Sequence, residues 1–197
     1  MSRKMSVIYV PDTGHAVAGV SRTSDPTIPF DLTSLGGGSV IVRNGEDVLA
    51  GTGGEELFIP STVLKVTSQP IDLDEGVMFT PLAYALDHDT PHVIGSSLPA
   101  ASTTTLAIDK ITLTVPTALS TVSDLEIWSQ VQEASPIAGA TPEIRISTGS
   151  LPKNATTVGI QLTGSPGGTP ITLPTGRTYY LLLLVAEYQS FFSTTPL

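Results

Sequence analysis

Apolar and polar residues alternate with a period of two in several segments of the chain. In residues 123–132, SDLEIWSQVQ, the apolar Leu125, Ile127 and Val131 fall on one face, and Glu and Gln residues occupy the other. Successive side chains of a β-strand point to opposite faces of the sheet, so this period indicates a strand with one buried face. The same alternation recurs in the segments 105–116, 143–147 and 157–164. Because Gly, Pro, Ser and Asn separate these segments at short intervals, the pattern predicts an all-β fold.

The predicted strands become longer and more regular after about residue 105. We therefore expect a small amino-terminal β module over residues 1–70, a connecting segment over 71–104, and a carboxy-terminal antiparallel β-sandwich over 105–197, of the jelly-roll or immunoglobulin-like type. An acidic stretch at 67–77 and a low-complexity stretch at 95–105 mark the two joints. A chain of 197 residues is long enough to bury the cores of two such units.

Helical periodicity is weak, and the prediction allows at most one short helix. The candidate is residues 78–89, MFTPLAYALDHD, because Pro81 fits the first turn of a helix. A helix there would gather four apolar residues on one face, namely Leu82, Ala83, Ala85 and Leu86. An extended segment is the alternative interpretation.

A β-hairpin is predicted at residues 39–51, SVIVRNGEDVLAG. Asn44 and Gly45 both tolerate the positive φ angles of a type I′ turn, and Val- and Ile-rich arms flank them. We expect a two-residue turn at Asn44-Gly45. The preceding Gly-rich stretch at 34–39 has no following helical pattern or Lys-Ser/Thr pair, so it predicts a flexible turn instead of a phosphate-binding loop.

The segment RTYYLLLLVAEYQ at residues 177–189 is apolar on both faces over 181–185. Such a strand belongs in the centre of a sheet covered on both sides, or in a sheet of which a partner covers one face. The following residues, SFFSTTPL, place Phe191 and Phe192 side by side in a polar tail. Either one phenylalanine packs within its own domain and the other is exposed, or the tail docks on a neighbouring subunit.

Composition excludes several classes of function. The chain has no cysteine, which excludes disulfides, thiolate metal sites and cysteine nucleophiles. Its formal net charge of −9 repels phosphate backbones, and its 9 basic residues are scattered along the sequence, so we expect no nucleic-acid partner. No nucleotide-binding or electron-transfer motif is present, and we expect no cofactor.

Neither a signal peptide nor a membrane span is expected. The basic start MSRK is followed by a four-residue apolar run before Pro11, which is too short for a signal-peptide core. The longest apolar run, residues 179–186, is well short of the ~20 residues that a membrane-spanning helix needs. We expect the protein to be made in the cytoplasm.

Two of the three histidines and two aspartates fall within residues 85–92, ALDHDTPH. Pro91 bars a regular helix, so His88 and His92 cannot share a helical face. On an extended loop, imidazole and carboxylate groups suit zinc, iron or manganese. The candidate metal ligands are Asp87, His88, Asp89 and His92. The alternative is a solvated acidic turn, because a closed site needs further ligands and His15 is remote in sequence.

The triplet Asp12-Thr13-Gly14 follows the apolar strand SVIYV. It resembles the active-site turn of aspartic proteases, and HVIG at 92–95 resembles the apolar-apolar-Gly segment of the retroviral-type enzymes. The resemblance implies Asp12 as a catalytic carboxylate shared across a dimer. Pro11 stands where that family has an apolar residue, His15 replaces Ala or Ser, and no second Asp-Thr-Gly is present. An ordinary turn is the alternative.

A serine nucleophile has no support, since the chain has no Gly-x-Ser-x-Gly segment. Three aromatic residues, Trp128, Tyr179 and Tyr180, form a candidate glycan-stacking platform on the predicted sandwich. The alternative is that these aromatic residues belong to the core.

An acidic, cysteine-free chain rich in Thr, Gly and Pro, with an apolar last strand and an aromatic tail, resembles in general style the structural proteins of phage tails, virion decorations and contractile injection particles. The resemblance implies a non-enzymatic subunit that self-associates as a homo-oligomer and binds other particle subunits. Residues 1–70 would attach the subunit, and strand edges and the tail would contact neighbours. The expected contact residues are Tyr188, Phe191, Phe192 and Leu197. A carbohydrate-binding or adhesin-like module is the first alternative, and an aspartic or metal-dependent hydrolase is the second.

Overall fold

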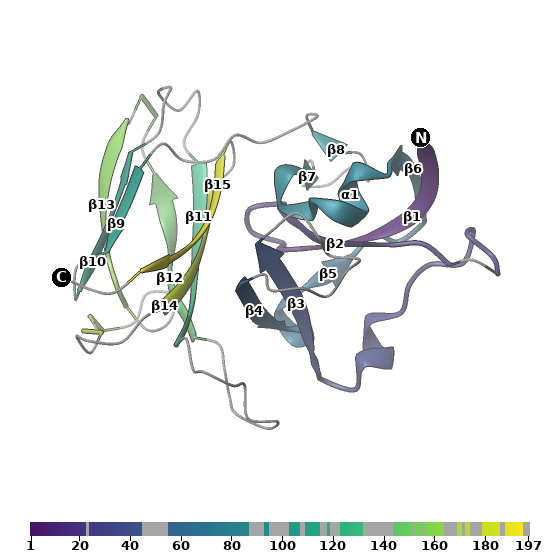
Figure 1. Cartoon of the computed structure of the whole chain (residues 1–197), viewed down its shortest axis with the longest axis horizontal. Coiled ribbons are helices and arrows are strands. Elements are labelled where there is room, and N and C mark those ends of the chain that lie inside the picture. The colour runs from purple at the N-terminus through teal and green to yellow at the C-terminus, as the bar shows by residue number, and fades with distance from the viewer. Residues whose placement is uncertain are drawn as a thin grey trace. The chain divides into compact units, whose positions relative to one another are not determined.

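A computed structural model shows the chain as two compact units, Met1–Leu98 and Pro99–Leu197, which are described separately (Figure 1). The structure describes residues 1–22, 24–44, 55–86, 93–94, 103–106, 109–114, 118, 123–131, 144–151, 153–154, 156–163, 169–170, 172–173, 179–185 and 188–194. For some of these it describes the backbone alone, namely residues 43–44, 55–56, 93–94, 103–106, 123–131, 144–151, 158, 180, 185 and 188–194.

The prediction of an all-β fold is confirmed. Every pairing among the described strands is antiparallel. Within the described residues the one α-helix is α1 (Gly76–Phe79), and the other helical elements are three 3-10 turns, η1 (Leu32–Leu35), η2 (Ser61–Val63) and η3 (Pro81–Ala83).

The first unit is built around the long strand β1 (Ser2–Tyr9). Strand β2 (Ala16–Val20) pairs with residues 6–9 of β1, while β5 (Lys65–Val66) and β6 (Ile71–Asp74) pair with its two ends. The core of this unit combines buried residues of β1 and β2 with residues of α1 and β7, namely Met5, Val7, Ala16, Val77 and Leu86. Residues 71–86, which the sequence analysis assigned to the connecting segment, thus lie inside the first unit.

The hairpin predicted at 39–51 has a different turn from the one expected. Strand β3 (Ser39–Asn44) pairs with β4 (Glu55–Pro60), and Asn44 lies opposite Glu55. Because Asn44 is paired inside the ladder, the prediction of a two-residue turn at Asn44-Gly45 is wrong. The chain connects β3 to β4 through residues 45–54, which lie outside the described residues.

The helix candidate at 78–89 is also corrected. Helix α1 ends at Phe79, and Pro81 begins the 3-10 turn η3 instead of a longer helix. The next residues form strand β7 (Ala85–Leu86), which pairs with β8 (Val93–Ile94). Pro81 does occupy the first-turn position that suits its fixed φ and missing N–H. The backbone beyond it becomes extended because Tyr84 and Leu86 bond to the β1–β2 hairpin.

The second unit contains two antiparallel sheets. One has the order β13-β10-β9 and the other the order β12-β11-β14-β15. Their strands are β9 (Thr103–Leu106), β10 (Lys110–Thr114), β11 (Ser123–Val131), β12 (Ile144–Leu151), β13 (Thr157–Gln161), β14 (Tyr179–Val185) and β15 (Tyr188–Thr194). Strand β10 shows the expected alternation, since Ile111 and Leu113 are buried and Lys110 is exposed.

Strand β14 occupies an inner position in its sheet, between β11 and β15. The side chains of Leu181, Leu182, Leu183 and Leu184 are exposed by no more than 1%. Neighbouring side chains of a strand point to opposite faces. Four consecutive buried leucines therefore mean that both faces of β14 are covered, which confirms the central position predicted from the apolar run.

Candidate functional site

The Asp12-Thr13-Gly14 triplet forms the turn that connects β1 to β2. The N–H of Gly14 donates to the carbonyl oxygen of Val10 at 2.8 Å, and the N–H of Val10 donates to the carbonyl oxygen of His15 at 2.9 Å. Gly14 has a φ of 75°, in the left-handed region that glycine adopts without strain. Asp12 is exposed at the start of the turn, whereas Thr13 and His15 are buried.

This turn is bonded to the segment 84–86, which is remote in the sequence. The N–H of Leu86 donates to the carbonyl oxygen of Gly14 at 2.7 Å, and the N–H of Ala16 donates to the carbonyl oxygen of Tyr84 at 2.9 Å. A Cβ atom on residue 14 would collide with the carbonyl oxygen of Leu86. Glycine is therefore needed at position 14 for two reasons: it adopts the positive φ angle without strain, and its lack of a Cβ leaves room for the carbonyl oxygen of Leu86. The arrangement accounts for the triplet as a structural turn.

The candidate metal ligands Asp87, His88, Asp89 and His92 lie outside the described residues. They follow Leu86, the last residue of β7, in the sequence. Within the described residues, no group of three His, Asp or Glu side chains is arranged to hold a metal ion.

The candidate glycan platform is divided between two strands. Tyr179 and Tyr180 begin β14, and Trp128 lies in β11 opposite Leu182, with Tyr180 opposite Gln130. The side chain of Tyr179 is 3% exposed. Stacking on a sugar ring requires an open aromatic face, so Tyr179 cannot form part of such a platform in this structure. For Trp128 and Tyr180 the structure describes backbone positions only.

The aromatic tail is largely a strand of the chain's own sheet. All seven residues of β15 pair with β14; Phe191 lies opposite Leu182, Phe192 opposite Leu181 and Tyr188 opposite Val185. Because Phe191 and Phe192 are neighbours in a strand, they belong to opposite faces of the sheet. Leu197 lies outside the described residues. Over residues 188–194 this segment is therefore an outer strand of the sheet and not a free tail.

The outer strands of the second unit carry almost no charge. Strands β9, β13 and β15 contain no charged residue and no proline, and β12 contains only Arg145. Among the described strands, each of these four pairs on one side only. Natural proteins usually protect such edges with lysine, proline or inward-pointing charges, because unpaired strand edges recruit other strands.

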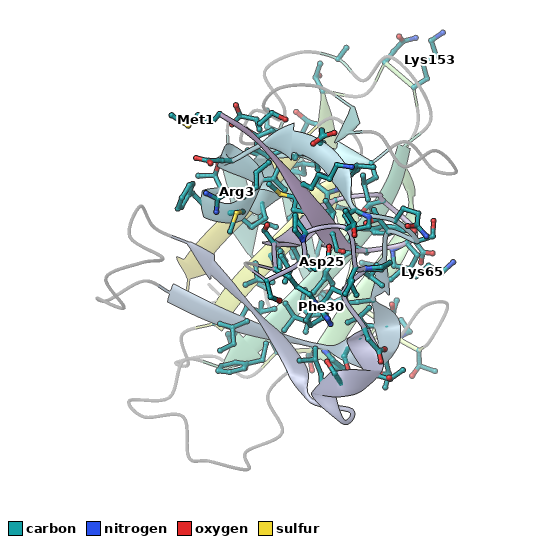
Figure 2. The ribbon with its side chains drawn as sticks, turned by 90° about the vertical axis from the view of Figure 1, so that its right-hand side faces the viewer. Met1, Arg3, Asp25, Phe30, Lys65 and Lys153 are labelled. Atoms are coloured by element: carbon teal, nitrogen blue, oxygen red, sulfur yellow. The ribbon has the colours of Figure 1, made fainter. Side chains whose placement is uncertain are left out.

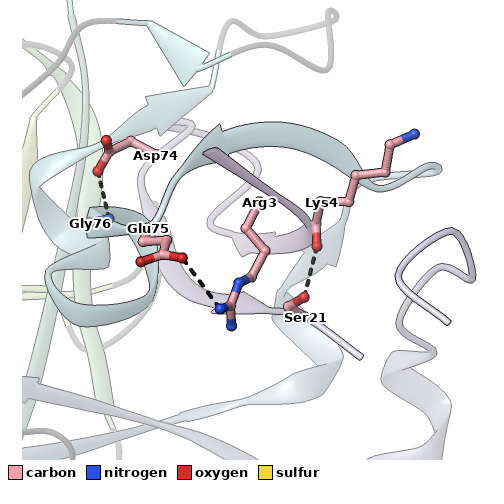
Figure 3. Close-up of polar contacts among 6 residues, drawn as sticks. All are labelled: Arg3, Lys4, Ser21, Asp74, Glu75 and Gly76. Atoms are coloured by element: carbon pink, nitrogen blue, oxygen red, sulfur yellow. Dashed lines mark hydrogen bonds and ion pairs between the residues drawn. The ribbon is translucent and has the colours of Figure 1, made fainter. Parts of the chain in front are cut away.

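In the first unit, by contrast, the outer strand β6 carries charged residues. Asp72 and Asp74 are exposed on this outer strand. Figure 3 shows the ordered polar contacts at the start of β1: Arg3 forms an ion pair with Glu75 at 3.3 Å, and Ser21 Oγ donates to the carbonyl oxygen of Lys4 at 2.8 Å. Such an exposed ion pair contributes little stability. Its charges do, however, make this edge unattractive to an apolar strand.

Two turns of the same kind shape the segment between β2 and β3. Asp25 and Phe30 of this segment are labelled in Figure 2. The carboxylate of Asp25 accepts hydrogen bonds from Thr27 Oγ1 at 2.6 Å and Thr27 N–H at 2.9 Å, and Asp31 bonds to Thr33 in the same way. The pKa of each carboxyl is lowered. The hydrogen bond from the threonine hydroxyl is the largest cause, and the hydrogen bond from the threonine N–H is the next. The N–H of Phe30 donates to the buried Ser6 Oγ at 2.9 Å, which attaches the segment to β1.

No protein-family model, curated protein or solved structure matches the chain. In the part of the chain that the structure describes, no helix is long and apolar enough to cross a membrane. The function is therefore inferred from the chain's own residues. Of the features described above, the uncharged strand edges are the one that the fold itself explains least.

Proposed function

We propose that the protein is a structural subunit of a multimeric particle of the phage-tail-like, contractile-injection or virion-decoration type. The subunit associates with copies of itself and with other particle subunits through strand edges, and it performs this role without catalysis and without a cofactor. In this proposal the protein is made in the cytoplasm and is then incorporated into the particle.

One observation carries the proposal, namely that β15 is a seven-residue outer strand without charge or proline. It pairs along its whole length with β14, whose leucines are buried. A strand held in this way presents the N–H and C=O groups of its other edge in a fixed, extended conformation. A neighbouring strand can bond to that edge with little loss of conformational freedom, as in strand-addition complexes.

The second unit is the packing domain in this proposal. Buried side chains are described in both sheets: Ile111 and Leu113 lie in β10, Ile160 lies in β13, and four consecutive leucines lie in β14. We propose that the two sheets pack as a sandwich. A sandwich leaves its outer strands at the rim, where they are accessible to neighbours.

The proposal is tested by charging the β15 edge. Gln189→Lys combined with Ser193→Lys adds two lysines to β15, and charged edge strands resist pairing with other strands. The matched control, Thr169→Lys with Thr172→Lys, adds the same charge at exposed positions outside the described strands. Light scattering on the full chain should show that the β15 variant loses mass relative to the native protein, while the control keeps it.

Circular dichroism and thermal unfolding of both variants should show retained β-structure, which separates lost association from lost folding. A native chain that stays monomeric at every concentration up to the millimolar range contradicts the proposal. So does a β15 variant that is folded and keeps the native mass, because strand-edge association at β15 would then make no contribution.

A further inference from the structure

The two aspartate turns between β2 and β3 share the same set of hydrogen bonds. In each turn the carboxylate accepts bonds from the hydroxyl and the N–H of the threonine two residues later. In each, the carbonyl oxygen of the aspartate also accepts the N–H of the residue three positions later. That N–H belongs to Ile28 in the turn of Asp25 and to Ser34 in the turn of Asp31. The two turns are therefore matched in backbone and carboxylate geometry.

The turns differ at the residue that follows the aspartate, which is Pro26 in the first and Leu32 in the second. Asp25-Pro26 is the only Asp-Pro sequence in the chain. The nitrogen of an X-Pro bond belongs to a tertiary amide. It carries one more carbon substituent than other peptide nitrogens, so it accepts a proton more readily and leaves more easily when its bond to carbon breaks. Pro26 is exposed, which gives water access to this bond.

The carboxylate of Asp25 is held beside the same peptide bond. Its Oδ1 accepts the N–H of Thr27 at 2.9 Å, and the ring that this bond closes includes the carbonyl carbon of Asp25 and the nitrogen of Pro26. Attack of a carboxylate oxygen on that carbonyl carbon forms a succinic anhydride ring. A nucleophile held next to its target reacts faster than one that must find the target by free rotation.

Two further features of the turn favour this attack. The N–H of Ile28 donates to the carbonyl oxygen of Asp25 at 3.4 Å, where negative charge develops when the carbon becomes tetrahedral. The hydrogen bond from the Thr27 hydroxyl, followed by the bond from the Thr27 N–H, lowers the pKa of Asp25. The carboxylate therefore stays ionised, and nucleophilic, further into the acidic range, in which the proline nitrogen is more readily protonated.

We propose that Asp25-Pro26 is a self-cleavage site that acts on acidification. A carboxylate oxygen of Asp25 bonds to the carbonyl carbon of Asp25, and the bond from that carbon to Pro26 breaks as the proline nitrogen takes a proton from solvent. Water then opens the anhydride, so one water molecule is consumed and no oxidant, reductant or cofactor takes part. The products are residues 1–25, which end in Asp25, and residues 26–197, which begin with proline. This inference goes beyond the proposed function and does not depend on it.

We expect the shorter product to stay bound after the cut. Residues 1–25 contain β1 and β2, and β1 pairs with β5 and β6 of the longer product. Residues of both products also share one core, in which Met5, Val7 and Ala16 lie with Val77 and Leu86. The first unit then consists of two polypeptides, and the segment that begins at Pro26 gains a free end.

The test uses the full chain, incubated between about pH 3 and about pH 6, around the ordinary pKa of Asp. Circular dichroism identifies the pH values at which the chain is folded, and mass spectrometry under denaturing conditions measures the two products. Cleavage after Asp25 should be at least about tenfold faster in the folded chain than in the chain unfolded with guanidinium at the same pH. Cleavage after Asp31, in the matched turn without proline, should not be detected in the same sample.

Exchanging the residues that follow the aspartates separates the role of the proline from that of the turn. Pro26→Leu should abolish cleavage after Asp25. Leu32→Pro should start cleavage after Asp31, because Asp31 is extended and Leu32 begins η1, positions that suit a proline and the residue before it.

A folded native chain that stays intact over the whole pH range overturns the inference, and so do equal cleavage rates in the folded and unfolded chains. A folded Pro26→Leu variant that is cleaved like the native protein overturns it as well. If Pro26→Leu does not fold, Leu32→Pro decides: a folded Leu32→Pro variant without cleavage after Asp31 contradicts the role given to the turn.

Discussion

Phe191 lies opposite Leu182 in the pairing of β15 with β14, within a single chain. Leu182 is fully buried, and β15 pairs with the strand that carries it. The segment expected to be a docking tail is thus part of the fold over residues 188–194. We expect association at this end of the chain to use the outer edge of β15.

Removing residues 191–197 should therefore destabilise the protein. The deletion removes the pairing partners of residues 179–182 in β14 and exposes two buried leucines, Leu181 and Leu182. Deleting only 195–197 leaves every β15 pair in place and serves as the control. Thermal unfolding should show a lower midpoint for the long deletion and a nearly native midpoint for the short one. Equal midpoints would show that β15 does not support β14.

Leu182→Ala should lower the free energy of unfolding by about 2–5 kcal/mol, because it removes a fully buried side chain and leaves a cavity between strands. Thr172→Ala, at an exposed position of the same unit, should change it by less than about 0.5 kcal/mol. Denaturant unfolding followed by circular dichroism measures both values. A loss below about 1 kcal/mol for Leu182→Ala would mean that one face of β14 is open.

Gly14→Ala and Gly36→Ala separate backbone strain from steric collision. Both glycines have positive φ angles, 75° and 59°, but a Cβ at residue 36 meets nothing within 4 Å, whereas one at residue 14 meets the carbonyl oxygen of Leu86. Left-handed φ alone costs an alanine roughly 1–2 kcal/mol. We expect about that loss for Gly36→Ala and at least ~1 kcal/mol more for Gly14→Ala. Equal losses in denaturant unfolding would argue against the contact with Leu86.

Thr27→Val should raise the pKa of Asp25 towards its ordinary value, because it removes the hydroxyl bond that is the largest cause of the lowered pKa. Asp31 keeps its bonds to Thr33 and provides an internal control. A carboxyl whose folded pKa is lowered stabilises the turn above the unfolded pKa, and that contribution is lost as pH falls through the folded pKa. Carbon-13 NMR titration of the carboxyl groups measures both shifts, and an unchanged Asp25 would refute the assignment.

The sequence predicted the features that depend on local pattern. Strict alternation located β10, and four consecutive leucines located the central strand β14, since only a strand covered on both faces tolerates such a run. The Asn44-Gly45 turn was predicted from an equally local signal and was wrong. The partner of Asn44 is Glu55, and register across a long connection depends on how both arms pack rather than on the turn residues.

The candidate sites depended on long-range contacts that no local pattern shows. The bond between Leu86 and Gly14, which are 72 residues apart, makes the Asp12-Thr13-Gly14 triplet a structural turn.

The central claim, that this chain associates through strand edges, is tested most directly by the molar mass of the unmodified protein. Multi-angle light scattering over a hundredfold range of concentration should give a mass that rises from that of the 20.5 kDa chain to at least twice that value. A mass that stays at that of one chain over the whole range, for a protein shown to be folded, would contradict the claim.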